Sequence, residues 1–167
     1  MAAQARAADP RDADAIARIY NEGIEDRLAT FETRLRSGAD VLEWLAEGFP
    51  VVVVEDGDGT IAAWASAPPS SDREAYAGVR EFSVYVAREA RGRGLGRAAM
   101  EALIAECRRR GYWKLVSRVF PENRASLALC RSLGFREVGV YRRHGKLDGA
   151  WRDCVIEELL LDDLEGP

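Results

Sequence analysis

Histidine and cysteine are scarce in this chain of 167 residues, which has one histidine, His144, and three cysteines. A catalytic or metal site that needs two histidines is therefore excluded. Cys107, Cys130 and Cys154 are odd in number, far apart and without CxxC spacing. This pattern predicts reduced thiols, with neither a disulfide framework nor a zinc site, and we expect no metal.

Long apolar runs are also missing. No stretch approaches the roughly 20 residues of a membrane span, and the N-terminus, MAAQARAADP, has no apolar segment typical of a signal peptide. We therefore expect a cytoplasmic protein with no membrane partner. Apolar residues make up 47% of the chain and charged residues 31%, a composition that favours a single folded domain with a substantial core.

Charge is unevenly distributed along the chain. The net charge of −4 argues against a nucleic-acid partner. Residues 1–80 contain 8 basic and 15 acidic side chains, whereas residues 81–160 contain 16 basic and 10 acidic ones. The second half is therefore expected to bind an anion.

The predicted helices and strands alternate. Asp9 and Pro10 are typical of a helix start, and apolar positions continue that helix toward residue 24. The other predicted elements are a helix at 40–47, a hairpin at 50–67, strands at 81–87 and 114–120, helices at 97–110 and 125–134, and strands at 135–141 and 153–161. This order indicates an α/β fold.

Three glycines, Gly92, Gly94 and Gly96, alternate with other residues directly after the strand EFSVYVA. Backbone N–H groups can converge there because no Cβ obstructs a ligand, and the following helix adds its unpaired N–H groups. Phosphate fits such a turn. A P-loop needs Lys and Ser or Thr after the glycine, and a Rossmann turn needs glycine where Arg97 stands, so both readings fail.

The turn instead fits the pattern Arg-x-x-Gly-x-Gly, from Arg91 to Gly96, and PENRASLALCRSLGF follows at 121–135. Together these stretches resemble the GNAT superfamily of N-acetyltransferases. The resemblance implies an α+β type of α/β fold with a mixed, mostly antiparallel central sheet flanked by helices on both faces. It implies one domain over residues 1–161, a short acidic tail at 162–167, and acetyl-coenzyme A as the acetyl donor.

Three further segments, IYNEGIEDRLATFETR, AYAGVREFSVYV and HGKLDGAWRDCVI, resemble the phosphinothricin and arsinothricin N-acetyltransferase branch. This resemblance implies acetylation of the α-amino group of a small glutamate analogue such as phosphinothricin, arsinothricin or methionine sulfoximine. It also implies resistance by detoxification and a homodimer formed through the C-terminal region. Two alternatives stay open: an acetyltransferase of protein N-termini or polyamines, and a non-catalytic acyl-coenzyme A sensor.

The resemblance also assigns roles to individual residues. An amine with a lysine-like pKa is protonated at neutral pH, so it needs a general base, and Glu81 stands where the family has one. The expected cofactor-binding residues are Val84, Tyr85, Val86, Arg91, Gly92, Arg93, Gly94, Leu95, Gly96, Arg97, Asn123 and Ser126. The expected substrate-binding residues are Phe31, Tyr76 and Arg80, and Arg73 and Arg118 are further candidate cations.

Cys130 departs from the family pattern. It stands four residues after Ser126, where the family usually has a tyrosine that gives a proton to the departing thiolate. The sequence leaves two readings, a small buried residue or a thiol that replaces the tyrosine as proton donor.

Overall fold

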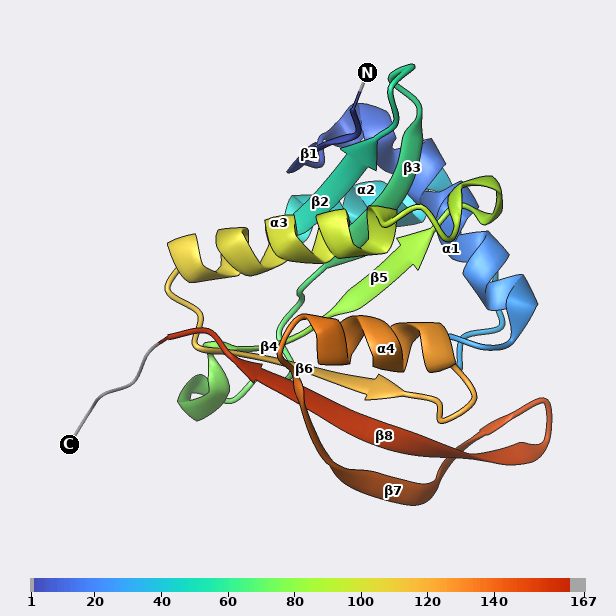
Figure 1. Ribbon diagram of the computed structural model, residues 1–167, viewed down its shortest axis with the longest axis vertical. Helices are drawn as coiled ribbons and strands as arrows, with labels where there is room; N and C mark the ends of the chain where they lie inside the picture. The colour runs from blue at the N-terminus through green and yellow to red at the C-terminus, as the bar shows by residue number, and fades with distance from the viewer. Residues whose placement is uncertain (1, 163–167) are drawn as a thin grey trace.

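The computed structural model describes residues 2–162 and contains two four-stranded sheets with helices around them (Figure 1). The first sheet has the order β1-β2-β3-β5 and the second has the order β4-β6-β8-β7. The strands are β1 (Gln4–Ala7), β2 (Val51–Glu55), β3 (Ile61–Ser66), β4 (Val79–Glu81), β5 (Ser83–Val86), β6 (Lys114–Val119), β7 (Arg136–Leu147) and β8 (Ala150–Leu160). The α-helices are α1 (Ala13–Asp26), α2 (Gly38–Glu47), α3 (Leu95–Arg109) and α4 (Arg124–Ser132).

The first sheet is entirely antiparallel and is covered on both faces. Helix α3 packs against β2 and β3 in front of the sheet in Figure 1, while α1 and α2 lie behind it. The continuous apolar sequence of β2 follows from this arrangement, because side chains on both faces of the strand are buried. Residues of this sheet and of α1 and α3 form the main hydrophobic core.

The second sheet combines one parallel pair, β4 with β6, with the antiparallel pairs β6–β8 and β7–β8. Helix α4 lies in front of this sheet in Figure 1. The expected fold class, a mixed and mostly antiparallel sheet with helices on both faces, is confirmed. The three cysteines are free and buried.

The predicted strand at 81–87 is interrupted, which corrects the sequence interpretation. Glu81 ends β4 in the second sheet, and Ser83 begins β5 in the first. Between them the Phe82 N–H donates to the Val116 carbonyl of β6 at 3.0 Å, while its ring is buried against Phe135. After Phe82, β5 pairs with β3 alone, so β5 and β6 diverge (Figure 1).

Several element boundaries differ from the prediction. Asp9 caps a short 3-10 helix, η1 (Pro10–Asp12), which precedes α1, and Ser37 caps α2 two residues earlier than expected. The two strands of the C-terminal hairpin are longer than predicted, since β7 continues to Leu147 and β8 begins at Ala150. Asp148 and Gly149, both with positive φ, form the turn between them. Within residues 2–162, no helix has the length and apolar character needed to cross a membrane. Most of the predicted tail at 162–167 lies outside the described residues, and the single-domain assignment stays a prediction.

Candidate active site

Two adjoining cavities lie where β5 separates from β6. The first is lined by Glu81, residues 29–32 and the end of β6, and has a volume of about 240 Å³. The second extends along the glycine turn and has a volume of about 350 Å³. They share five lining residues, Ala29, Val84, Tyr85, Asn123 and Ser126. The two cavities are therefore two ends of one site.

The glycine turn forms the floor of the second cavity. Gly92 and Gly94 have φ values of 76° and 81°, in the left-handed region, and a Cβ on either would meet no protein atom within 4 Å. The left-handed backbone conformation therefore explains these two glycines, and close packing does not. The space above them is open. Gly94 is the N-cap of α3, so the first N–H groups of that helix face the same space.

The arginines of the turn are held by carboxylates from other elements. Arg91 Nη2 lies 2.8 Å from Asp26 Oδ2, and Arg93 Nη1 lies 2.8 Å from Asp56 Oδ2. About half of each arginine side chain remains exposed, so solvent weakens each pair and an incoming anion can replace the carboxylate. Although desolvation opposes it, hydrogen bonds from Arg88 and Arg91 lower the pKa of Asp26.

Backbone groups of β5 complete the second cavity. The Ala87 N–H bonds to the Ala62 carbonyl of β3, and antiparallel pairs alternate between bonded and non-bonded positions. The N–H groups of Val84 and Val86 therefore point away from β3, toward the gap. Since β5 is the edge of its sheet, these groups are available to a ligand.

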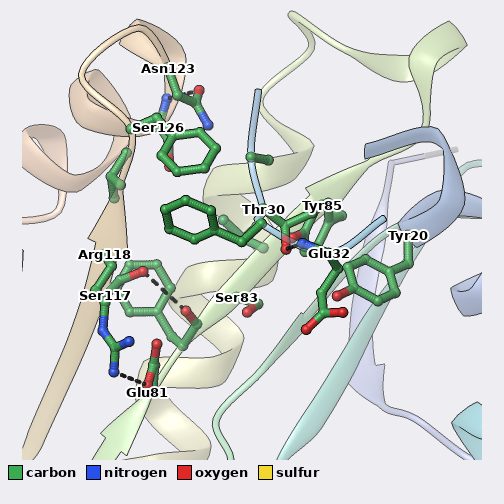
Figure 2. Close-up of a pocket in the computed structure, with 16 residues that line it drawn as sticks. Tyr20, Thr30, Glu32, Glu81, Ser83, Tyr85, Ser117, Arg118, Asn123 and Ser126 are labelled. Carbon is green, nitrogen blue, oxygen red and sulfur yellow. Dashed lines mark hydrogen bonds and ion pairs between the residues drawn. The ribbon is translucent and has the colours of Figure 1, made fainter. Parts of the chain in front are cut away.

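Asn123 and Ser126 close the site from the side of α4 (Figure 2). Asn123 is the N-cap of α4, and its side-chain oxygen accepts from the Ser126 N–H at 3.2 Å. This cap explains the asparagine in PENRAS: it satisfies a free N–H of the helix and places both side chains at the border of the two cavities.

The first cavity contains a carboxylate beside a guanidinium. Glu81 Oε2 lies 3.4 Å from Arg118 Nη2, and the two side chains are 34% and 51% exposed (Figure 2). Arg118 comes from β6, the strand that pairs in parallel with β4, and lies two residues beyond Val116, the partner of Glu81. Among the described residues that line this cavity it is the only arginine or lysine. In this pair, Glu81 is a proton acceptor and Arg118 is an anion-binding group.

Two tyrosines and a second carboxylate also line this cavity: Tyr85 was expected as a cofactor-binding residue, whereas Tyr20 and Glu32 were not predicted. Burial raises the pKa of Tyr85 well above its usual range, and burial also raises the pKa of Tyr20. Both phenols therefore stay protonated at neutral pH and can donate hydrogen bonds. Glu32 lies near Tyr20 in Figure 2 and pairs with Arg36 at 2.9 Å. Tyr20 lies on the buried face of α1 and also belongs to the main core.

Most of the expected cofactor-binding residues line the second cavity: Val84, Tyr85, Val86, Arg91, Gly92, Gly94, Leu95, Gly96, Arg97, Asn123 and Ser126. Arg93 is the exception, since its side chain turns to Asp56 and does not line the cavity. Of the expected substrate-binding residues, Phe31 lines the first cavity.

The structure does not bring Arg80 or Tyr76 to this site. Side chains alternate along a strand, so Arg80 and its neighbour Glu81 point to opposite faces of β4. The Arg80 Nε donates to the Ala67 carbonyl at 2.9 Å, and its guanidinium lies over the Tyr112 ring at 4.3 Å. Arg80 and Arg73 line a separate hollow, and Tyr76, 47% exposed, lines neither of the two cavities described above.

Cys130 lies on the buried face of α4, is 2% exposed and lines neither cavity. Burial raises the pKa of its thiol to about 12, and the nearby carboxylate of Glu157 acts in the same direction. Of the two readings of this residue, the structure supports the small buried one.

Comparison with known proteins agrees with this geometry. Residues 16–135 match the acetyltransferase (GNAT) family. An L-methionine sulfoximine/L-methionine sulfone acetyltransferase of Pseudomonas paraeruginosa is 32% identical over 97% of this chain and 96% of its own length. A phosphinothricin N-acetyltransferase of Alcaligenes faecalis is 35% identical over 87% of this chain and 76% of its own length.

A solved acetyltransferase structure from Salmonella typhimurium, which contains its cofactor acetyl-CoA, superposes with a TM-score of 0.93. It is 32% identical, and the match covers 100% of this chain and 98% of that chain. The open glycine turn, the helix N-terminus and the free β5 edge are the features that fit a diphosphate followed by a long thioester arm. The chain therefore belongs to the GNAT acetyltransferase family and is an N-acetyltransferase that takes its acetyl group from acetyl-CoA.

Proposed function

We propose that the protein acetylates the α-amino group of a small glutamate-analogue amino acid, of the phosphinothricin, arsinothricin or methionine sulfoximine type, and thereby removes its toxicity. The observation that carries this proposal is the juxtaposition of Glu81 and Arg118 in a cavity of about 240 Å³. A cavity of this size, with the loop 29–32 among its walls, suits a free amino acid better than a protein chain. The names of the two relatives support the same acceptor class.

Glu81 acts as the general base in this proposal. It accepts the proton that an ammonium group must lose before its nitrogen can attack a carbonyl carbon. Acetyl-CoA supplies the acetyl group as a thioester, and transfer forms a C–N bond as the C–S bond breaks. The outward N–H groups of Val84 and Val86 are suited to hold a carbonyl oxygen that gains negative charge.

Arg118 binds the carboxylate of the acceptor. In the free protein its guanidinium lies beside Glu81, and a bound carboxylate would compete with Glu81 for the same donors. Acceptor binding would therefore draw Arg118 away from Glu81 and leave that carboxylate free to take the proton. The base is released only when an acceptor with an acidic group is present.

The glycine turn holds the diphosphate of acetyl-CoA in this proposal, together with Arg91 and Arg97. Replacing Gly94 by valine should raise the dissociation constant of coenzyme A at least about tenfold, because a branched side chain enters the cavity and disfavours the left-handed backbone. Isothermal titration calorimetry measures this change. Gly59→Val is the matched control, since Gly59 has a φ of 85° with open space around it but lies in the turn between β2 and β3. Equal affinity of both variants would contradict the assignment of the turn.

Replacing Glu81 by glutamine should lower kcat by about a hundredfold or more, with the affinity for acetyl-CoA unchanged. Thiol release is followed with phosphinothricin, arsinothricin, methionine sulfoximine, a polyamine and an N-terminal peptide as acceptors. The same variant should fail to protect cells from the toxic amino acid. Glu43→Gln, an exposed carboxylate on α2, serves as the control. Turnover of the peptide or polyamine alone would refute the acceptor class, and no turnover of any amine would favour an acyl-CoA sensor.

Replacing Arg118 by glutamine should raise the KM of amino-acid acceptors about tenfold or more, because a charge-assisted contact to the carboxylate is lost. The KM of an acceptor of the same shape, in which a neutral amide replaces the carboxylate, should change little in this variant. Arg109→Gln, at an exposed arginine at the C-terminal end of α3, is the control. If the KM values of the acid and the amide rise equally, Arg118 does not bind the carboxylate of the acceptor.

We further propose a homodimer that covers β7. This strand is exposed on both faces over nearly its whole length, and Val138, Val140 and Tyr141 are 45–53% exposed. Size-exclusion chromatography with light scattering should give twice the chain mass for the wild type and a shift toward the monomer for Val140→Lys. A monomeric wild type would overturn this proposal and leave the catalytic one intact.

A further inference from the structure

Phe31 forms one wall of the Glu81 cavity, and its ring also packs against the Phe120 ring and the backbone of Gly145. Its ring meets the Phe120 ring edge-on, with centroids 4.8 Å apart, and Phe120 belongs to a small core with Leu147 and Cys154. On its other side lies the backbone of Gly145 in β7. A Cβ built on Gly145 would lie 2.7 Å from the Phe31 Cε1 atom and 2.8 Å from its Cζ atom. Atoms cannot approach so closely, so only glycine allows the ring its present position.

The hairpin that carries Gly145 is attached to the loop that carries Phe31. Arg27 Nε lies 2.9 Å from Asp148 Oδ2 at the hairpin turn, and Arg152 Nη2 donates to the Arg27 carbonyl at 3.4 Å. The Arg152 guanidinium also lies over the Phe120 ring at 5.2 Å. These contacts and the pairing of Gly145 with Arg152 link the hairpin to residues 27–31, so we expect the Phe31 ring to move more readily than the Gly145 backbone.

We infer that Gly145 sets the depth of the acceptor cavity. Because position 145 has no side chain, the Phe31 ring can lie against the backbone of β7 and leave the cavity open. This inference rests on the proposed function, since it concerns the choice of acceptor. With Phe120 behind the ring and the hairpin beside it, the free direction for Phe31 is into the cavity that it lines. Any side chain at position 145 would push the ring that way and shorten the space for the acceptor side chain. Gly145 is a positioning residue that makes no contact with the acceptor itself.

The test compares Gly145→Ala with Gly139→Ala, which adds the same methyl group to the same strand. Neither glycine has positive φ, and a Cβ on Gly139 meets nothing within 4 Å, so the two variants differ chiefly in the contact with Phe31. Gly145→Ala should raise the KM for long acceptors such as methionine sulfone about tenfold, as expected when a pocket loses room for one carbon. The kcat and the coenzyme A dissociation constant should stay within about twofold, because the chemistry and the glycine turn are untouched. Gly139→Ala should match the wild type in KM, and because Gly139 lies beside Val138 and Val140, light scattering checks that both variants keep the oligomeric state of the wild type.

A second variant tests the mechanism. Combining Gly145→Ala with Phe31→Leu should return the KM to that of Phe31→Leu alone, because the smaller side chain leaves room for the added methyl group. Additive effects of the two substitutions would contradict the inference. A crystal structure of Gly145→Ala provides a readout independent of activity, and the Phe31 ring should be displaced into the cavity.

Each outcome separates the inference from the proposed function. If the wild type acetylates methionine sulfone and Gly145→Ala behaves as Gly139→Ala does, the inference is overturned and the function stands. If the wild type acetylates no amino acid, the function fails, and the crystal structure alone then decides whether Gly145 positions Phe31. A ring that keeps its place in that structure overturns the inference in either case.

Discussion

The divergence of β5 from β6 at Phe82 is the constraint on which the whole site depends. The N–H of Phe82 is bonded to β6, its carbonyl accepts from the Ser117 hydroxyl at 3.2 Å, and its ring is buried against Phe135. These contacts hold this point of the chain to the second sheet, while Ser83 and the residues after it pair with the first. One continuous segment therefore joins two sheets that separate beyond it. The gap between them contains both cavities, and its β5 edge supplies unpaired N–H groups that a continuous sheet would have consumed.

The charges of the site follow from how the two halves of the chain meet. Acidic residues of the first half pair with arginines of the second, as in Asp26 with Arg91 and Asp56 with Arg93. Such pairs hold long side chains near the glycine turn without neutralising it, because the groups remain partly exposed and weakly coupled. In the proposed cofactor site, a diphosphate carries more charge than one carboxylate and so would compete well for Arg91. It must also overcome the repulsion of Asp26, whose lowered pKa keeps it ionised.

The parts of the candidate site that the sequence places beside one cavity are local. The glycine turn and the segment around Asn123 depend on backbone conformation and on residues a few positions apart, so their spacing reveals them. The break at Phe82 could not be predicted, because EFSVYVA has the pattern of one strand and only pairing with two different sheets divides it. The direction of Arg80 was missed for a similar reason: its partners, Ala67 and Tyr112, come from distant segments. Tyr20 was not predicted as a site residue. It belongs to the main core and also lines the first cavity.

The two ends of the site are built from different kinds of segment, and this difference has consequences for specificity. The cofactor end consists mainly of consecutive residues from β5 into α3, so changes there disturb binding of the acetyl donor directly. The acceptor end is assembled from the loop after α1, the end of β6 and, through Phe31, the β7–β8 hairpin. These segments can change without altering the glycine turn. Enzymes of one fold can therefore keep a common acetyl donor while their acceptors differ, and in our proposal the residues that select the acceptor include one, Gly145, that does not touch it.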